Sequence, residues 1–374
     1  MLIQKVDDSD SRSKMAGQKF PYIDSLRGLA ILMVICVHHS QQFEHIGWIA
    51  SLAGFGQMGV QLFFVVSAYT LCMSADGRAI EKNNIRNFYI RRFFRIAPLY
   101  YIGIFIYLLI SIISDNYIDF IQKYSLINVM SNVFLLHGMV PTANNSVVPG
   151  GWSIGTEMLF YTIFPLMVPI FKWMGKSPLR FFVVFSISIL VNGIFQVLVF
   201  KIFSTKIQNN TFLYFFITNQ IPVFVIGSYA YNTYKSKKYI NINKYLMGFL
   251  VGCAATAVLL YFGTPKASLL LPPVAGLAFF ALVRLAEALP YRTGLLEKIG
   301  QVSYSMYVFH FLFAVYATNI ILRICGHDRG TELLMYLPTL LLAIILTFAI
   351  AQISKRLVED RFIEVGRESI RRLS

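Results

Sequence analysis

The sequence predicts an all-α polytopic membrane protein, a bundle of about ten transmembrane helices. Of its 374 residues, 56% are hydrophobic and 14% are charged, whereas a soluble domain usually has about 45–50% apolar and about 25% charged residues. The apolar residues gather into runs of about 20, the length that crosses a hydrocarbon core. The formal charge of +15 comes from short connections between these runs, so we expect no nucleic-acid partner.

Ten runs are long and apolar enough to cross a bilayer. They cover residues 26–43, 56–74, 96–113, 153–171, 181–200, 212–232, 245–262, 268–288, 301–322 and 333–353. An eleventh segment, 125–137, is short and interrupted by polar residues, and whether it crosses decides the orientation of everything after it.

The distribution of Lys and Arg decides this question. If 125–137 does not cross, 27 of the 33 basic residues lie on the side of the N-terminus and 6 lie opposite, whereas a crossing would give 16 and 17. Cytoplasmic loops carry the excess of Lys and Arg. We therefore expect cytoplasmic N- and C-termini and a long outer loop, 114–152, that dips toward the bilayer through 125–137. Loops of this length are usually functional.

These spans predict one transmembrane domain with short tails. The domain is expected over 22–356, between a cytoplasmic N-terminal tail, 1–21, and a cytoplasmic C-terminal tail, 357–374. The polar N-terminus has no apolar region typical of a cleavable signal peptide. Glu359, Asp360 and Glu364 lie among basic residues and suggest a solvated mixed-charge segment.

The four cysteines lie in or beside apolar runs without any C-x-x-C pair. They are typical of small core residues, so we expect neither a disulfide nor a metal site.

The first span carries two ionisable residues on one helix face. Arg27 and His38 are eleven residues apart, which is about three helical turns and about 16.5 Å along the axis. Charges inside spans are costly and are functional candidates. Arg27 near the cytoplasm suits a phosphate group, and His38 deeper on the same face suits proton abstraction. The alternatives are a snorkelling anchor for Arg27 and a helix–helix hydrogen bond for His38.

A basic stripe opens the third span. Arg92 and Arg95 are spaced i, i+3, and Arg91 can join Arg95 at i, i+4, so these guanidinium groups can share a helix face. Such a stripe is either an anchor for lipid headgroups or a second clamp for a polyphosphate from the cytosol. The clustering favours the clamp.

Three further residues lie inside or beside spans on the outer half of the bundle. Glu157, expected near the depth of His38, can orient an imidazole or bind a substrate hydroxyl. Trp152 is typical of an aromatic belt, and beside Glu157 it can also stack on a sugar ring. His310 lies near mid-membrane, where a histidine more often makes an interhelical hydrogen bond.

Together these residues resemble the acyltransferase-3 family of integral membrane acyltransferases, in its single-domain branch. Arg27 and His38 match the family's arginine, ten residues, histidine signature, and residues 59–68 resemble its second-span motif, with Ala68 in place of glycine. Arg92 and Arg95 match its third-span entry. Trp152 and Glu157 match its Trp-Ser-x-x-x-Glu element, and Ser303 to His310 match Ser-Tyr-x-x-Tyr-x-x-His. The resemblance extends over about residues 20–362.

The resemblance implies O-acyl transfer, most often of acetyl, from cytosolic acetyl-CoA or another acyl-CoA to a hydroxyl of a surface or lipid-linked glycan, such as O-antigen or exopolysaccharide. It also implies a bacterial inner (plasma) membrane, with glycan-assembly machinery as a partner. We expect Arg27, Arg91, Arg92 and Arg95 to bind the donor, and His38, Arg27 and Glu157 to be catalytic. The acceptor residues expected are Trp152, Glu157 and His310.

The sequence leaves two questions open. His38 either acts as the general base in direct transfer or carries the acyl group itself. A transporter or exporter of glycan, or a structural subunit of a glycan-assembly complex, is an alternative function. The absence of a detectable internal repeat disfavours a transporter.

Overall fold

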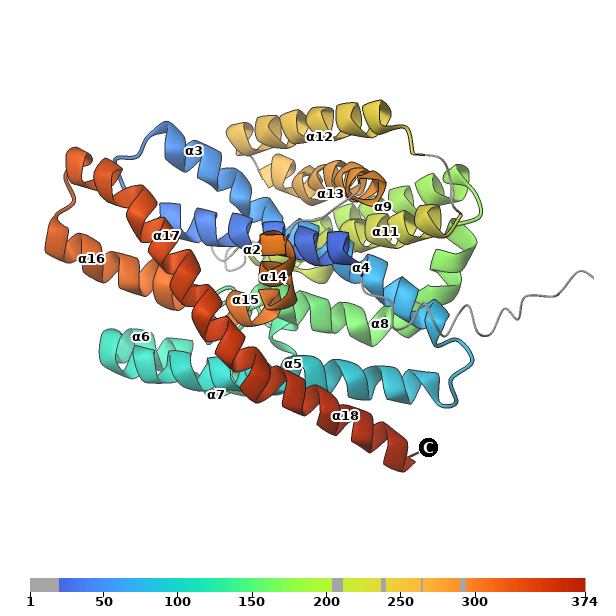
Figure 1. Ribbon diagram of the computed structural model, residues 1–374, viewed down its shortest axis with the longest axis horizontal. Coiled ribbons are helices and arrows are strands. Elements are labelled where there is room, and N and C mark those ends of the chain that lie inside the picture. The colour runs from blue at the N-terminus through green and yellow to red at the C-terminus, as the bar shows by residue number, and fades with distance from the viewer. Residues whose placement is uncertain (1–19, 204–210, 237–239, 264, 290–293, 374) are drawn as a thin grey trace, which may run out of the picture.

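The structure, a computed structural model, describes residues 20–203, 211–236, 240–263, 265–289 and 294–373 (Figure 1). Over these ranges it contains helices and connecting turns and no β-strand, which confirms the predicted all-α membrane architecture. Most of the long helices run side by side along the longest axis of the molecule. Of the predicted N-terminal tail, residues 1–19 lie outside the described ranges.

The helices have the following bounds. The first half of the chain forms α2 (Pro21–Ser40), α3 (Trp48–Gly54), η1 (Phe55–Met58), α4 (Gly59–Gly77), α5 (Asn84–Ser114), α6 (Tyr117–Lys123), α7 (Leu126–Val133), η2 (His137–Met139) and α8 (Trp152–Met174). The second half forms α9 (Pro178–Phe203), α10 (Phe212–Phe215), α11 (Ile217–Lys235), α12 (Ile242–Phe262), α13 (Pro265–Ala288), α14 (Gly294–Gln301), α15 (Ser303–Phe311), α16 (Thr318–Cys325), α17 (Arg329–Ser354) and α18 (Asp360–Leu373). Two π-helical turns, η3 (Leu312–Ala317) and η4 (Lys355–Glu359), follow α15 and α17.

Ten stretches of the described chain are long and apolar enough to cross a membrane. Each coincides with one of the ten predicted runs, so the predicted spans are confirmed. The main difference is at their ends. The third span begins at Asn84 rather than near residue 96, because the arginine-rich segment continues the helix of α5 beyond the apolar run.

The segment 125–137 does not form a span. It contains α7, a helix of 8 residues, which is about 12 Å long against a hydrocarbon core of about 30 Å. Figure 1 shows α6 and α7 beside the end of α5. The prediction that 125–137 does not cross is therefore confirmed, while the placement of the 114–152 loop on the outer side stays a prediction.

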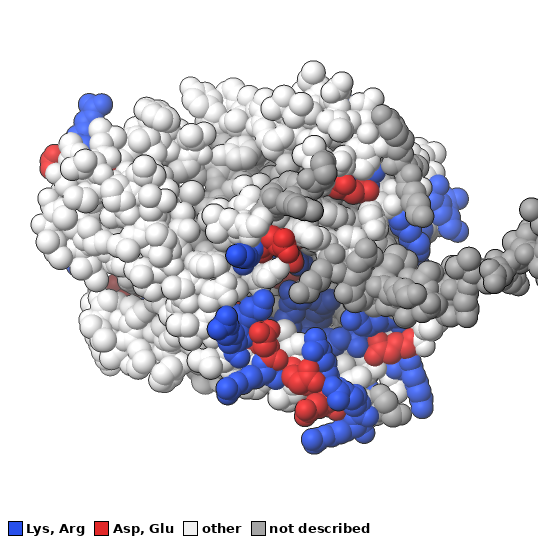
Figure 2. Space-filling view, in the orientation of Figure 1, with Lys and Arg blue, Asp and Glu red and all other residues white. Residues whose placement is uncertain are grey.

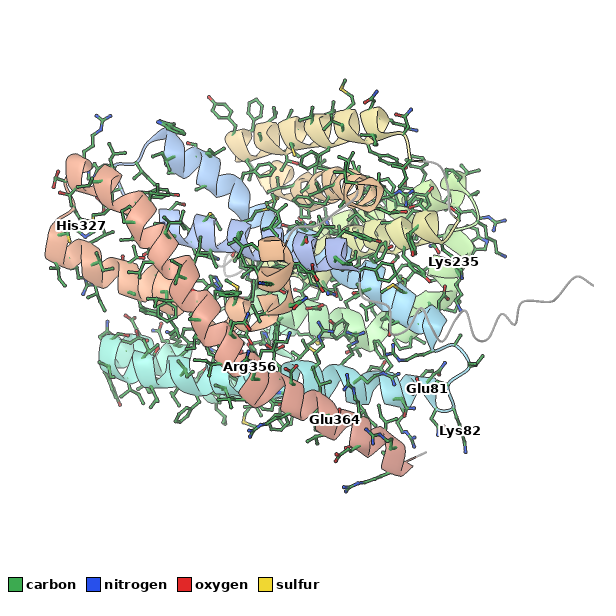
Figure 3. All side chains as sticks on the ribbon, in the orientation of Figure 1. Glu81, Lys82, Lys235, His327, Arg356 and Glu364 are labelled. Carbon is green, nitrogen blue, oxygen red and sulfur yellow. The ribbon has the colours of Figure 1, made fainter. Side chains whose placement is uncertain are left out.

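Charged side chains are concentrated at one end of the bundle. Figure 2 shows Lys and Arg over α18 and the start of α5, and large parts of the visible face carry no charged side chain. In Figure 3, Glu81, Lys82 and Lys235 lie at one end, and His327 lies at the opposite end. The predicted cytoplasmic and outer connections thus separate in space, while the assignment of the basic end to the cytoplasm stays a prediction.

The C-terminal segment continues α17 as α18, which packs on α5 instead of forming a free tail. Gly366 faces Phe94, and the Arg86 guanidinium donates to the Leu373 carbonyl at 3.0 Å. The interpretation of Glu359 as a solvated residue is wrong. Its side chain is buried and accepts a hydrogen bond from Ser305, because the register of the continuous helix turns it toward α15.

Helix α2 lies in the core and contacts α4, α14, α15 and α17. Its crossing with α14 depends on two glycines. A Cβ atom on Gly28 would lie 2.2 Å from the Leu296 carbonyl oxygen, and a Cβ on Gly300 would lie 1.6 Å from the Asp24 carbonyl oxygen. Small residues let helix backbones approach closely in membrane proteins, and here they fix the helix that carries Arg27 and His38.

This crossing predicts that Gly300→Ala destabilises the protein by about 3 kcal/mol or more, because a backbone carbonyl cannot move away as a side chain can. The matched control is Gly294→Ala on the same helix, where no described atom lies within 4 Å of the added Cβ. Thermal unfolding of both variants in detergent checks the prediction. Equal melting temperatures for the two variants would contradict it.

Candidate active site

A cavity lies among α2, α4, α5, α8 and α15. The space free of protein atoms is about 690 Å³, a volume that includes open solvent at the mouth of the cavity. Its lining residues are Arg27, Val60, Phe63, Phe64, Ser67, Thr70, Arg92, Arg95, Ile96, Ser153, Ile154, Glu157, Tyr161, Ser303, Tyr304 and Tyr307. The cavity therefore combines guanidinium groups, one carboxylate, hydroxyls and an apolar wall.

Three arginines from two helices line this cavity. Arg27 of α2 donates to Asp24 at 3.1 Å and to Thr70 at 3.2 Å. Arg92 of α5 lies over the Tyr161 ring, with its Cζ atom 5.3 Å from the ring centroid, and its Nε has no hydrogen-bond partner among the described residues. Arg95 lies one turn further along α5. The fold thus brings together the two arginine motifs that the sequence placed in separate spans.

Glu157 lies in the same cavity as these arginines. Its carboxylate accepts hydrogen bonds from Ser67 and from Tyr161, the latter at 2.5 Å. The sequence suggested that Glu157 orients His38, but its described hydrogen bonds join it to α4 and to its own helix instead. The reason is that Glu157 points into the cavity, which His38 does not line.

Arg91 lies outside the cavity. Its guanidinium forms two hydrogen bonds with the Glu81 carboxylate, at 2.9 and 3.1 Å. Burial disfavours the charged form of Glu81, but the bonds from Arg91 and Asn87 outweigh this effect and hold the pKa of Glu81 below its usual value. Arg91 therefore ties the start of α5 to Glu81 in the α4–α5 connection, while its neighbour Arg92 faces the cavity.

Tyr307 joins the cavity to the two histidines. Its hydroxyl accepts a hydrogen bond from Ser153 at 2.7 Å and donates one to the Gly150 carbonyl at 3.0 Å. Its ring centroid is 5.4 Å from that of His310. The rings of His310 and His38 are 5.3 Å apart. The face of α2 predicted to carry both Arg27 and His38 thus runs from the arginines to this histidine pair.

Trp152 is buried and does not lie open at the rim. Its ring stacks on Phe215 with centroids 4.3 Å apart, and its side chain is 8% exposed. From the sequence we expected Trp152 to stack on a sugar ring, and in the structure it stacks on Phe215 of the protein itself. Trp152 packs α8 against α10, next to Ser153, which lines the cavity.

The outer loop is anchored through a buried histidine. The His137 ring stacks on Tyr100 with centroids 5.2 Å apart, and Nε2 donates to the Gly151 carbonyl at 2.9 Å. Gly150, which has a φ of 74°, accepts a hydrogen bond from Tyr307, and a Cβ atom added to it would lie 3.0 Å from the Phe311 ring. The loop therefore holds the start of α8 against the helix that carries His310.

Several cavity residues were not singled out from the sequence. Ser67, Tyr161 and Tyr304 are hydroxyl residues in apolar helices. A single hydroxyl residue in such a helix forms no spacing pattern that would mark it as part of a site. Ser67 and Tyr304 do lie inside segments that resemble motifs of the family. These motifs could therefore have identified them, whereas helix periodicity alone could not. In the described part of the chain, no group of three or more His, Cys, Asp or Glu can hold a metal ion.

Comparison with known proteins agrees with this architecture. The model of a family described as an acyltransferase domain matches residues 20–355. The chain belongs to the acyltransferase-3 family.

Three relatives show how far the similarity extends. The peptidoglycan O-acetyltransferase OatA of Listeria monocytogenes is 27% identical over 46% of this chain and 28% of its own length. The acyltransferase MdmB of Streptomyces mycarofaciens is 24% identical over 43% and 42%, and the O-acetyltransferase OatA of Staphylococcus aureus is 23% identical over 91% and 56%. The chain thus spans about a quarter to just over half of these relatives. No solved structure matches it.

The buried His137 predicts an acid-sensitive loop. Burial lowers the pKa of His137 from 6.5 to about 4, against an opposing effect of the bond to Gly151. As pH falls, His137 therefore binds a proton in the unfolded chain before it does so in the folded protein. The contribution of neutral His137 to the free energy of unfolding is complete above pH 6.5. It declines toward pH 4 by at most about 1.4 kcal/mol per pH unit.

Melting temperatures of wild type and His137→Gln in detergent, measured from pH 7.5 to 4.5, check this prediction. Glutamine can still donate to Gly151 but does not titrate. We expect a shallower acid decline for the variant. Parallel curves would contradict the prediction, since the other histidines contribute equally to both proteins.

Proposed function

We propose that this protein is a membrane O-acyltransferase that moves an acyl group, with acetyl the first choice, from cytosolic acyl-CoA to a hydroxyl of a cell-surface or lipid-linked glycan. The observation that carries the proposal is the two-ended cavity. Arg27, Arg92 and Arg95 supply positive charge at one end, and Tyr307 at the other end contacts His310 of the histidine pair. The family and its O-acetyltransferase members support the same reaction class.

The arginine end suits the phosphates of a nucleotide donor. Guanidinium groups bind phosphate in a bidentate manner, and low surrounding polarity strengthens such contacts. The apolar wall of Phe63, Phe64 and Ile154 suits a thioester arm that extends from the phosphates toward the histidines. With the basic end of the bundle in the cytoplasm, the donor enters from the compartment that holds acyl-CoA.

The other end suits acyl transfer to a hydroxyl. An imidazole can take a proton from the acceptor or form a bond to the acyl carbon. Glu157 is held by Ser67 and Tyr161, and its charge offsets part of the positive charge of the arginines. In this proposal the acceptor approaches from the outer loop, whose Gly150 accepts a hydrogen bond from Tyr307.

The proposal is tested by acyl transfer in isolated membranes that contain the source cell's own envelope glycan, with radiolabelled acetyl-CoA as the donor. We expect label in the glycan with wild type and none with His38→Ala at matched expression. Equal label with both proteins would remove His38 from the chemistry. No label with wild type, together with donor-independent movement of glycan across the membrane, would favour a transporter instead.

The two neighbouring arginines predict different effects on the donor. Arg92 faces the cavity and Arg91 is paired with Glu81. Loss of a charge-assisted hydrogen bond costs about 1.5–3 kcal/mol, so Arg92→Ala should raise KM for acetyl-CoA by about tenfold or more. Arg91→Ala should change it less than about threefold. Steady-state kinetics of both variants measure this difference, and equal KM values would contradict the assignment of Arg92 to the donor.

A further inference from the structure

The histidine pair consists of His38 from α2 and His310 from α15. Their ring centroids are 5.3 Å apart, and the Phe311 ring lies 4.5 Å from each. His310 is fully buried, whereas His38 is partly exposed. The π-helical turn η3 begins one residue after Phe311, and such turns occur frequently at functional sites.

A hydrogen bond to the backbone sets the tautomer of His310, and the Gln41 side chain bonds to the corresponding atom of His38. His310 Nδ1 lies 2.6 Å from the Tyr307 carbonyl oxygen, and His38 Nδ1 lies 3.2 Å from the Gln41 amide oxygen. Because the Tyr307 backbone carbonyl can only accept, Nδ1 carries the proton in neutral His310. With the Gln41 amide oxygen toward its ring, His38 takes the same tautomer. Each Nε2 atom then carries the lone pair.

The Nε2 atom of His310 has no hydrogen-bond partner among the described residues. A buried polar atom without a partner is costly, and such atoms need an explanation. His38 does not supply one, because both Nε2 atoms are acceptors and cannot bond to each other. In these tautomers the two neighbouring rings offer two acceptor nitrogens, whereas one general base requires only one.

An acyl group on His38 would leave that residue without a base. Its Nε2 would hold the acyl carbon, and its Nδ1 would still hold the proton that is donated to Gln41. The neighbouring Nε2 of His310 is free to take the acceptor's proton. We propose that the two histidines divide the reaction, with His38 as the nucleophile that carries the acyl group and His310 as the general base for the acceptor. This inference rests on the proposed function.

The proposed reaction has two bond-exchange steps, in which bonds, electrons and protons balance. His38 Nε2 bonds to the thioester carbonyl carbon, the C–S bond breaks, and the thiolate leaves with the electron pair. The acceptor oxygen then bonds to the same carbon, the C–N bond breaks with its electron pair returning to His38, and the hydroxyl proton passes to His310 Nε2. The released thiolate takes a proton from water, and His310 finally gives the hydroxyl proton to water, so the protons balance and both rings return to the neutral state.

The test follows the radiolabelled acetyl group in the His310→Gln variant. Purified protein is mixed with radiolabelled acetyl-CoA and the source cell's envelope glycan, and the released thiol, the label on the protein and the label on the glycan are measured. We expect a burst of about one thiol per protein and label retained on the protein, since the first step needs no base. Transfer to glycan should fall by about 10²- to 10⁴-fold, the usual contribution of a general base. The double variant His38→Ala/His310→Gln should retain no label.

Two further variants separate this role from packing. His310→Asn keeps an amide donor near the Tyr307 carbonyl and should behave like His310→Gln. His39→Gln alters the adjacent buried histidine, which bonds to Thr339 at 2.9 Å, and should transfer at the wild-type rate per folded protein without retaining label.

Transfer by His310→Gln at the wild-type rate, or loss of transfer with no burst and no retained label, would overturn the division of roles. In either case the proposed function would stand as long as wild type still acylates the glycan. A wild-type protein that neither releases thiol nor transfers label would overturn both.

Discussion

Three guanidinium groups lie inside an apolar bundle, and the free-energy cost of burying them constrains the rest of the structure. A charged side chain costs about 2.5–3.5 kcal/mol at mid-membrane and less near a helix end, where it can reach the interface. Arg27, Arg92 and Arg95 all line one cavity. Asp24 and Thr70 satisfy Arg27, and the Tyr161 ring covers Arg92. A carboxylate, hydroxyls and an open cavity beside the arginines lower this cost. The same features create a site that an anionic ligand can complete.

Close backbone packing keeps this arrangement in register. The crossing of α2 and α14 at Gly28 and Gly300 leaves no room for a side chain, so α2 cannot slide or rotate without separating from α14. Because Arg27 and His38 share this one helix, their separation is fixed by the helix and not by a loop. The outer loop adds a second constraint, since His137 holds Gly151 while Gly150 receives the Tyr307 hydroxyl.

The sequence predicted the fold well because hydropathy and charge are summed over whole segments. All ten spans and the non-crossing segment 125–137 followed from run length and from the positions of Lys and Arg. The site was predicted less completely, because helix periodicity places a residue on a face and does not name the neighbour. Arg91 and Arg92 are adjacent on the chain, yet one pairs with Glu81 and the other faces the cavity. The burial of Glu359 similarly depends on a continuous helix that composition does not reveal.

Tyr307 lies where the two halves of the site meet, and its contacts show how the halves can communicate. Tyr307 lines the arginine cavity, its hydroxyl holds the outer loop through Gly150, and its backbone carbonyl fixes the tautomer of His310. Any shift of α15 that opens a path from the cavity to the histidines must also break or move the bond to Gly150. The position of α15 is thereby linked to the position of this loop through one side chain.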